Sequence, residues 1–165
     1  MTRLTVCLFL AVLILGCGAT KETTQEVMLT GWTTRSDFFN GSFPGFQARY
    51  DTVQIAPDMV ELIADFNDGT DWLVFLGTWC SDSYREVPAF LRIVDNAGID
   101  STRIRYYGLD RDKMSPGGFE QGYDITRVPT IIFMRDGTEI GRIVERSEPG
   151  MEDEMLRILM EGGEE

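Results

Sequence analysis

The chain has 165 residues, of which 43% are hydrophobic and 11% aromatic, enough to build one domain with a buried core rather than a disordered chain. Acidic residues outnumber basic ones 27 to 15, and the resulting formal net charge of -12 argues against nucleic acid as a partner. The chain contains no histidine, which excludes Ser-His-Asp catalysis, Cys-His catalysis and histidine-zinc sites.

The first segment has the features of a targeting signal. Arg3 precedes an apolar run, residues 4–15, which is too short to span a bilayer and has the length of a signal-peptide core. The run ends in "LILGC", residues 13–17, which resembles the bacterial lipobox, whose cysteine is lipidated. We expect a lipoprotein signal peptide over residues 1–16 and a lipid on Cys17. A secretory peptide cut elsewhere and an uncleaved anchor are the alternatives.

Lipidation on Cys17 implies a place in the bacterial cell envelope, attached to the membrane through the N-terminal lipid and facing the periplasm or the extracellular side. Gly18 stands where many lipoproteins retained in the inner membrane have aspartate, which favours the outer membrane in a cell with two membranes. Residues 17–26 are small and polar, as expected for a tether. Because Cys7 would leave with the signal peptide, Cys80 would be the only free thiol of the mature protein, in a compartment where disulfides persist.

Residues 27–56 are too apolar for a free linker. They contain Trp32 and four phenylalanines, at positions 38, 39, 43 and 46. We expect an irregular N-terminal extension that packs on the domain.

The domain itself, residues 57–162, begins with alternating helix and strand patterns. Apolar residues at helical spacing predict a helix that starts near Pro57 and ends at "NDG". The continuous apolar run of residues 72–76 predicts a strand that is covered on both faces. A second helical stripe runs from Val87 to Val94 and is closed by Gly98.

The second half of the domain continues the alternation. Residues 103–110 are typical of a strand, and residues 128–144 are typical of a hairpin around Asp136 and Gly137. A last amphipathic helix carries Met151, Met155, Ile158 and Leu159. The whole pattern predicts an α/β sheet with helices on its faces.

The stretch "GTWCSDSYREVP", residues 77–88, carries the candidate chemistry. Cys80 stands at the predicted start of a helix, where unpaired N–H groups and the helix dipole stabilise a thiolate, the reactive form of the thiol. Ser83, three residues later, cannot resolve a mixed disulfide, because a hydroxyl does not attack sulfur at neutral pH. Asp82 places a carboxylate beside the thiol and opposes the dipole if the two groups are close.

The same residues also have a purely structural interpretation. Ser83 to Glu86 form a capping-box pattern, in which the two side chains would satisfy helix N-terminal N–H groups. Asp82 suits the same positive helix end. Trp79 and Pro129 could likewise serve packing and turn geometry alone.

Residues 57–160 resemble the thioredoxin superfamily. The resemblance rests on a buried strand that leads into Trp79-Cys80, on Pro88 eight residues after the cysteine, and on "VPT", residues 128–130, before a strand and an Asp-Gly hairpin. More narrowly, the Trp-Cys-x-Asp-Ser motif resembles bacterial envelope proteins described only as thioredoxin-like. The resemblance implies a thioredoxin-like fold, with a central mixed sheet flanked by helices.

The resemblance also implies a substrate-binding loop. Val128, a cis Pro129 and Thr130 would lie against the thiol, where backbone groups can pair with an extended substrate, and Trp79 would shield one side of the sulfur. Val74 stands where many thioredoxins keep a buried acid that assists proton transfer.

Two functions follow as alternatives. A single thiol can exchange disulfides when the partner supplies the second sulfur, which gives isomerase-like or de-glutathionylating activity with Cys80 as nucleophile. The partners would be protein or small-molecule thiols and disulfides. The other function is a redox-inactive binding module that holds a peptide or protein partner on the face of Trp79 and Pro129.

Other activities are disfavoured. We expect no cofactor and no metal, because the chain has no histidine and no second thiol beside Cys80. A one-cysteine peroxidase is disfavoured because Gly77 stands where peroxiredoxin-type sites have Thr or Ser. Residues 108–124 could border the site, but their Gly and Pro content also suits an ordinary loop, so they receive no role.

Overall fold

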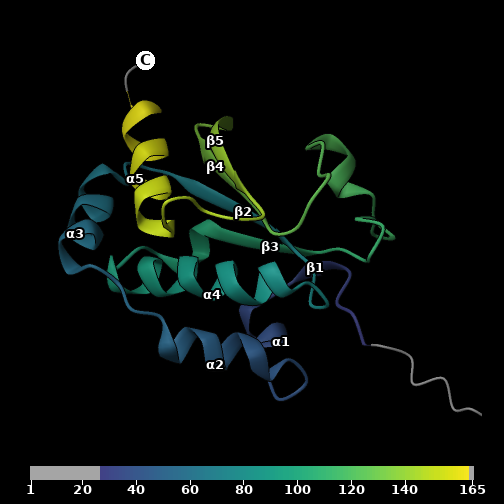
Figure 1. Cartoon of the computed structure of the whole chain (residues 1–165). Coiled ribbons are helices and arrows are strands. Elements are labelled where there is room, and N and C mark those ends of the chain that lie inside the picture. The colour runs from purple at the N-terminus through teal and green to yellow at the C-terminus, as the bar shows by residue number, and fades with distance from the viewer. Residues whose placement is uncertain (1–26, 164–165) are drawn as a thin grey trace, which may run out of the picture.

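A five-stranded mixed sheet, with strand order β1-β3-β2-β4-β5, forms the centre of the computed structural model, which describes residues 27–163 (Figure 1). The predicted signal peptide of residues 1–16, Cys17 and the tether of residues 17–26 lie outside the described residues. β2 and β3 are parallel, and the other three neighbouring pairs are antiparallel. The strands are β1 (Gly31–Thr33), β2 (Asp71–Leu76), β3 (Ile104–Gly108), β4 (Thr130–Arg135) and β5 (Thr138–Val144).

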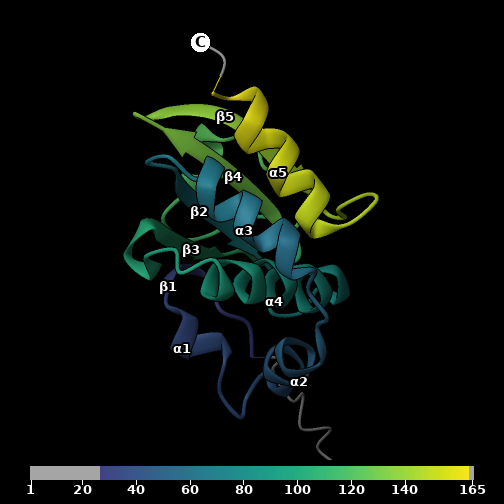
Figure 2. The same cartoon turned by 90° about the vertical axis from the view of Figure 1, so that its left-hand side faces the viewer.

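Three helices, α3, α4 and α5, lie together on one face of the sheet, as Figure 2 shows. α2 packs on the side of α4 that faces away from the sheet. The helices are α1 (Arg35–Phe38), α2 (Pro44–Thr52), α3 (Pro57–Phe66), α4 (Ser81–Asn96) and α5 (Met151–Glu161), with short 3-10 turns at Ser101–Arg103 and Phe119–Gly122. None of the helices within residues 27–163 is long and apolar enough to cross a bilayer.

The predicted fold class is confirmed: the domain is α/β, with a central mixed sheet flanked by helices. Each predicted helix and strand of residues 57–162 is present. The continuous run of residues 72–76 is fully buried in β2, because this strand is covered on both faces. Gly98 follows α4 with a φ of +66°, the left-handed conformation that commonly ends a helix.

Residues 27–56 differ from the prediction, because they are not irregular. They form β1, which pairs with β3, and the helices α1 and α2. Phe38 and Phe46 are fully buried, with ring centres 5.2 Å apart, and Phe38 lies at the same distance from Tyr106 of β3. These aromatic contacts fold the segment into the main core.

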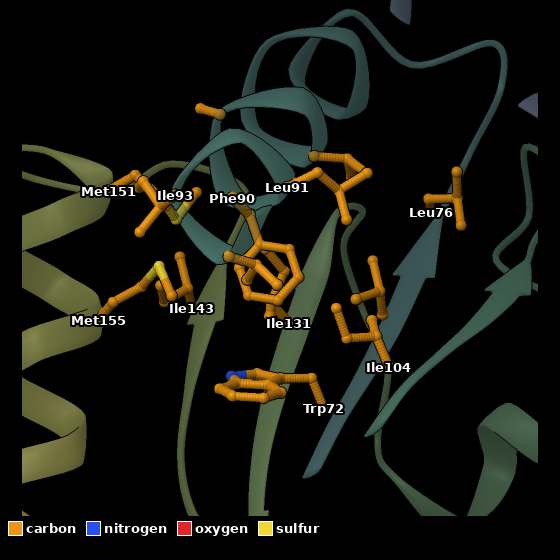
Figure 3. Close-up of a cluster of buried hydrophobic side chains, with 14 of the residues drawn as sticks. Trp72, Leu76, Phe90, Leu91, Ile93, Ile104, Ile131, Ile143, Met151 and Met155 are labelled. Atoms are coloured by element: carbon orange, nitrogen blue, oxygen red, sulfur yellow. The ribbon is translucent and has the colours of Figure 1, made fainter. Parts of the chain in front are cut away.

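The main core lies between the sheet and the layer of α3, α4 and α5. Trp72 of β2 is fully buried and contacts the rings of Phe90 and Phe133 (Figure 3). A second, smaller cluster lies on the opposite face, where the connection between β3 and β4 covers the sheet. Trp79 and Cys80 pack against this second cluster, so the candidate site lies beside it.

Candidate functional site

Cys80 occupies the N-cap position of α4. Its backbone is extended, and its carbonyl accepts a hydrogen bond from the N–H of Tyr84 at 3.1 Å, which closes the first turn of the helix. The Cys80 N–H donates to the carbonyl of Gly77 at 2.9 Å, so a tight turn connects β2 to the helix. The thiol is free and partly buried. It therefore lies at the positive end of a 16-residue helix, where a thiolate is stabilised.

The loop of Val128 and Pro129 lies against this thiol. The peptide bond between the two residues is cis. The Cys80 thiol donates a hydrogen bond to the Val128 carbonyl, with an Sγ to O distance of 3.2 Å. The structure thus brings Cys80 into contact with Val128, 48 positions away in sequence, and Val128 precedes the predicted cis Pro129.

The side chain of Thr130 binds the backbone of its own loop. It is buried, and its hydroxyl donates to the carbonyl of Arg127 at 2.8 Å. The side chain of Val128 is buried as well, so it is the carbonyl of Val128 that reaches the thiol. Of the predicted substrate-binding residues Val128 and Thr130, it is Val128 that contacts the thiol, through its backbone carbonyl.

Ser83 is not a helix cap, which corrects the predicted capping box. The N-cap of α4 is Cys80, and the helix begins at Ser81, so Ser83 already lies inside the first turn. The Ser83 side chain is fully buried, and its hydroxyl accepts a hydrogen bond from the N–H of Gly77 at 3.1 Å. Glu86 accepts hydrogen bonds from Arg85 and Ser147 instead of a helix N–H.

Trp79 is anchored to the connection between β3 and β4. Its indole N–H donates to the carbonyl of Leu109 at 2.8 Å. The Arg111 guanidinium lies 5.1 Å, and the Lys113 ammonium 5.9 Å, from the centre of the indole ring. This residue therefore packs between the thiol segment and two cations of the 108–124 region, which received no role from sequence.

The carboxylate of Asp82 lies beside two arginines. Its carboxylate lies 2.7 Å from the guanidinium of Arg85 and 3.5 Å from that of Arg146. Burial opposes the charge of Arg85, but hydrogen bonds with Glu86 and Asp82 outweigh it and raise the pKa of the guanidinium. The negative charge of Asp82, predicted to oppose the helix dipole, is therefore shared with two positive groups.

No acid assists the thiol from the position of Val74. Its side chain is fully buried in the main core, among other buried hydrophobic side chains. Within residues 27–163 no group of three or more His, Cys, Asp or Glu side chains could hold a metal ion.

A hollow of about 330 Å³ opens beside the thiol. It is lined by Trp79, Cys80, Lys113, Thr126, Arg127, Val128 and Glu145. The Arg127 guanidinium forms an ion pair with Glu145, and the N–H of Glu145 donates to the carbonyl of Pro129 at 2.7 Å. The arrangement places a partly buried thiol, the Val128 carbonyl and charged side chains around one open space.

Sequence reasoning missed Lys113, Arg127 and Glu145. They come from two connections, one between β3 and β4 and one after β5. A signal for Lys113 did exist: β2 and β3 are parallel, so the segments that follow them meet at the same edge of the sheet. Nothing local in the sequence marks Arg127 or Glu145.

Comparison with known proteins agrees with this geometry. A family model described as thioredoxin matches residues 44–157. Thioredoxin H9 of Arabidopsis thaliana is 25% identical to the chain over 85 residues, which are 52% of this chain and 56% of that protein. The chain thus spans little more than half the length of this curated relative.

Two solved structures have a similar fold. One is a protein of unknown function from Pseudomonas aeruginosa, with a TM-score of 0.52 and 15% identity over 74% of this chain and 84% of that chain. The other is an HIV epitope-scaffold, with a TM-score of 0.51 and 15% identity over 74% of this chain and 85% of that chain. At this identity both similarities show the fold alone. Because the family model covers more than half of its length, the chain belongs to the thioredoxin family.

Proposed function

We propose that this chain exchanges thiols and disulfides through its single active-site cysteine, by forming mixed disulfides with its partners. A thioredoxin-family domain suggests a redox or thiol-disulfide role in general. The observation that carries the narrower proposal is the contact of the partly buried Cys80 thiol with the Val128 carbonyl at 3.2 Å, at the N-terminus of α4. Residues 27–163 contain no second cysteine that could resolve the mixed disulfide.

The proposed reaction has two balanced steps. The Cys80 thiolate attacks one sulfur of a partner disulfide, the S–S bond of the partner breaks, and a new S–S bond joins the partner to Cys80. The displaced sulfur leaves with the electron pair of the broken bond and takes a proton from water. A second thiolate, from the partner or from a small thiol, then attacks the partner sulfur, and Cys80 leaves as thiolate. The disulfide bond is thus passed from one pair of sulfurs to another with no net change in the oxidation state of Cys80, as in isomerisation or de-glutathionylation.

Ser83 explains why the second step needs an outside thiol. Its hydroxyl is fully buried and accepts the N–H of Gly77, so it has a structural contact and no reactivity toward sulfur. The mixed disulfide therefore persists until another thiol arrives. This distinguishes the proposed cycle from that of a two-cysteine site, which releases its partner by itself.

The test is capture of a neutral model disulfide by the full-length protein. With hydroxyethyl disulfide, the parent should gain a mixed disulfide on the peptide that contains Cys80, mapped by mass spectrometry, and a thiol such as glutathione should release it. Cys80→Ser should show no adduct on that peptide, while the matched control Ser83→Ala keeps it. An unreactive Cys80, or an adduct that glutathione does not release, would falsify the proposal.

The second candidate function is a binding module in which Cys80 is incidental. One observation favours it: the apolar, fully buried Val74 stands at the strand position where many thioredoxins have an acid that assists proton transfer. In that case Cys80→Ser should retain a captured partner with unchanged affinity. An exchange protein should instead lose partner capture completely on the same substitution.

The envelope location belongs to the same proposal. It is supported by the pattern "LILGC", residues 13–17, after a short apolar core. In a bacterial host, radiolabelled fatty acid should be incorporated into the parent protein and not into a Cys17→Ser variant. Equal labelling of the two proteins would contradict lipidation at this residue.

A further inference from the structure

We propose that the thiol site selects disulfides that carry carboxylate groups. This inference rests on the proposed function, because it names the class of substrate that Cys80 would attack. It is built from the charges around the hollow beside the thiol, which differ from those of the chain as a whole. The chain has a net charge of -12, whereas the hollow is lined by two cations, Lys113 and Arg127, and one anion, Glu145.

Lys113 is the central residue of this inference. It is the one lysine within residues 27–163, and no carboxylate in that range forms an ion pair with its ammonium group. The ammonium donates to the carbonyl of Arg111 at 2.9 Å and lies 5.9 Å from the ring centre of Trp79. A positive charge without a carboxylate partner therefore lines the space next to the thiol.

The turn that carries Lys113 is fixed by Asp110. The Asp110 carboxylate accepts hydrogen bonds from the N–H groups of Asp112 and Met114, each at 2.9 Å. The N–H of Lys113 itself donates to the Asp110 carbonyl at 3.0 Å. Because these contacts hold the backbone on both sides of Lys113, its side chain starts from a defined position.

Glu145, which lines the hollow, and Asp82, two residues after Cys80, are already paired with arginines. Glu145 pairs with Arg127, and Asp82 lies within ion-pair distance of both Arg85 and Arg146. The N-terminal N–H groups of α4 add partial positive charge at Cys80. Among residues 27–163, no carboxylate forms an ion pair with Lys113 in the hollow, and a carboxylate on the substrate would supply one.

The size of the hollow suits a small group rather than a folded surface. About 330 Å³ lies at the lower end of the range for small-ligand sites. The carboxylate could belong to a small acidic disulfide or to an acidic stretch of an extended polypeptide. In both cases the S–S bond breaks and re-forms on Cys80 as described above, and the carboxylate binds Lys113 without reacting.

The test compares the rates at which three disulfides modify Cys80 in the full-length protein: glutathione disulfide, which carries carboxylates, uncharged hydroxyethyl disulfide, and cystamine, which carries amines. At low ionic strength the parent should prefer glutathione disulfide over the uncharged compound, and cystamine should react slowest. Lys113→Glu should lower the ratio of the glutathione disulfide rate to the hydroxyethyl disulfide rate by about fivefold. Salt at about 0.5 M should remove most of this difference between the parent and the variant. Lys113→Gln should give an intermediate ratio.

Arg105→Glu is the matched control, because it makes the same change of charge at an exposed arginine near the start of β3. Lys113 and Cys80 follow the far ends of β3 and β2, so this control should leave the ratio as in the parent. If hydroxyethyl disulfide fails to modify Cys80, the proposed function itself is wrong. If it reacts but Lys113→Glu keeps the parental ratio, only the carboxylate preference is wrong.

A further comparison separates the two sources of the carboxylate. Two peptide disulfides of equal length are used, one with glutamates and one with glutamines beside the cysteine. Each preference is a ratio of rates: the glutamate peptide over the glutamine peptide, and glutathione disulfide over hydroxyethyl disulfide. A larger ratio for the peptides indicates an acidic polypeptide as the substrate. The reverse order indicates a small acidic disulfide, and no preference in either series overturns the inference.

Discussion

Trp72→Ala is expected to lower the free energy of unfolding by about 3–5 kcal/mol, the usual cost of removing a large buried aromatic side chain. Trp72 is fully buried in β2, beside Phe90 of α4 (Figure 3). The centre of its ring lies 6.0 Å from that of Phe90 and 6.1 Å from that of Phe133. Because domains have a total stability of about 5–15 kcal/mol, this one change removes a large part of it. Urea unfolding followed by circular dichroism measures the loss.

Trp72→Phe separates the packing of this side chain from its polar atom. The indole N–H of Trp72 is buried, and no acceptor within residues 27–163 is in hydrogen-bonding distance. A buried donor without a partner costs about 1–3 kcal/mol, so its removal offsets much of the cavity left by the smaller ring. We expect Trp72→Phe to stay within about 1 kcal/mol of the parent. A loss as large as that of Trp72→Ala would show that the shape of the indole, rather than its hydrophobic area, is required.

The parts of the fold that follow from sequence are those with a periodic apolar pattern. α4 and α5 each bury one stripe of side chains, α3 buries Val60 and Ile63, and β2 buries five consecutive residues. α2 and β1 lack such a pattern. α2 buries only Phe46, and β1 has three residues, of which Trp32 is 56% exposed. These elements form because tertiary contacts stabilise them, chiefly the pairing of β1 with β3 and the aromatic packing of Phe38 and Phe46.

The site shows a similar division. Trp79, Cys80 and Ser83 belong to one short stretch, and the resemblance supplies Val128 and Pro129. Local sequence does not predict which group a side chain will contact in the folded protein. The capping-box pattern at Ser83 has the right residue types, but the hydroxyl contacts Gly77, because the helix already begins after Cys80.

Only part of the charge pairing around the thiol follows a local pattern. Asp82 pairs with Arg85 at the i,i+3 spacing of a helix, whereas its second partner, Arg146, lies 64 residues later. Glu145 pairs with Arg127 from a different connection. That Lys113 lines the hollow without a carboxylate partner among residues 27–163 can be read only from the folded chain. The acidic composition of the chain gives the opposite impression, because it describes the average surface and not the hollow beside Cys80.

Ser83→Cys is expected to convert the site into one that releases its own partner. The substitution places a second thiol three residues after Cys80, in the first turn of α4. The introduced thiolate attacks the Cys80 sulfur of the mixed disulfide, an S–S bond forms within the chain, and the partner leaves as a thiol after taking a proton from water. Because this attack is intramolecular, release without added thiol should accelerate by at least about tenfold.

The cost of this change is a weaker hydrogen bond. The Ser83 hydroxyl accepts the N–H of Gly77 at 3.1 Å in a fully buried position, and sulfur is a poorer acceptor. We therefore expect a loss of about 1 kcal/mol in the free energy of unfolding, small enough to keep the protein folded. Ser83→Ala, which also loses the acceptor but gains no thiol, should show a similar loss of stability and no change in release.

The measurement is the lifetime of a mixed disulfide between Cys80 and a fluorescent peptide, in buffer without free thiol. The adduct should persist in the parent and in Ser83→Ala, and should decay in Ser83→Cys as the intramolecular disulfide appears in the mass spectrum. A persistent adduct in Ser83→Cys would mean that the buried side chain of this position cannot reach the Cys80 sulfur. The dependence of the natural protein on an outside thiol would then come from the geometry of the first turn of α4, and not from the chemistry of serine.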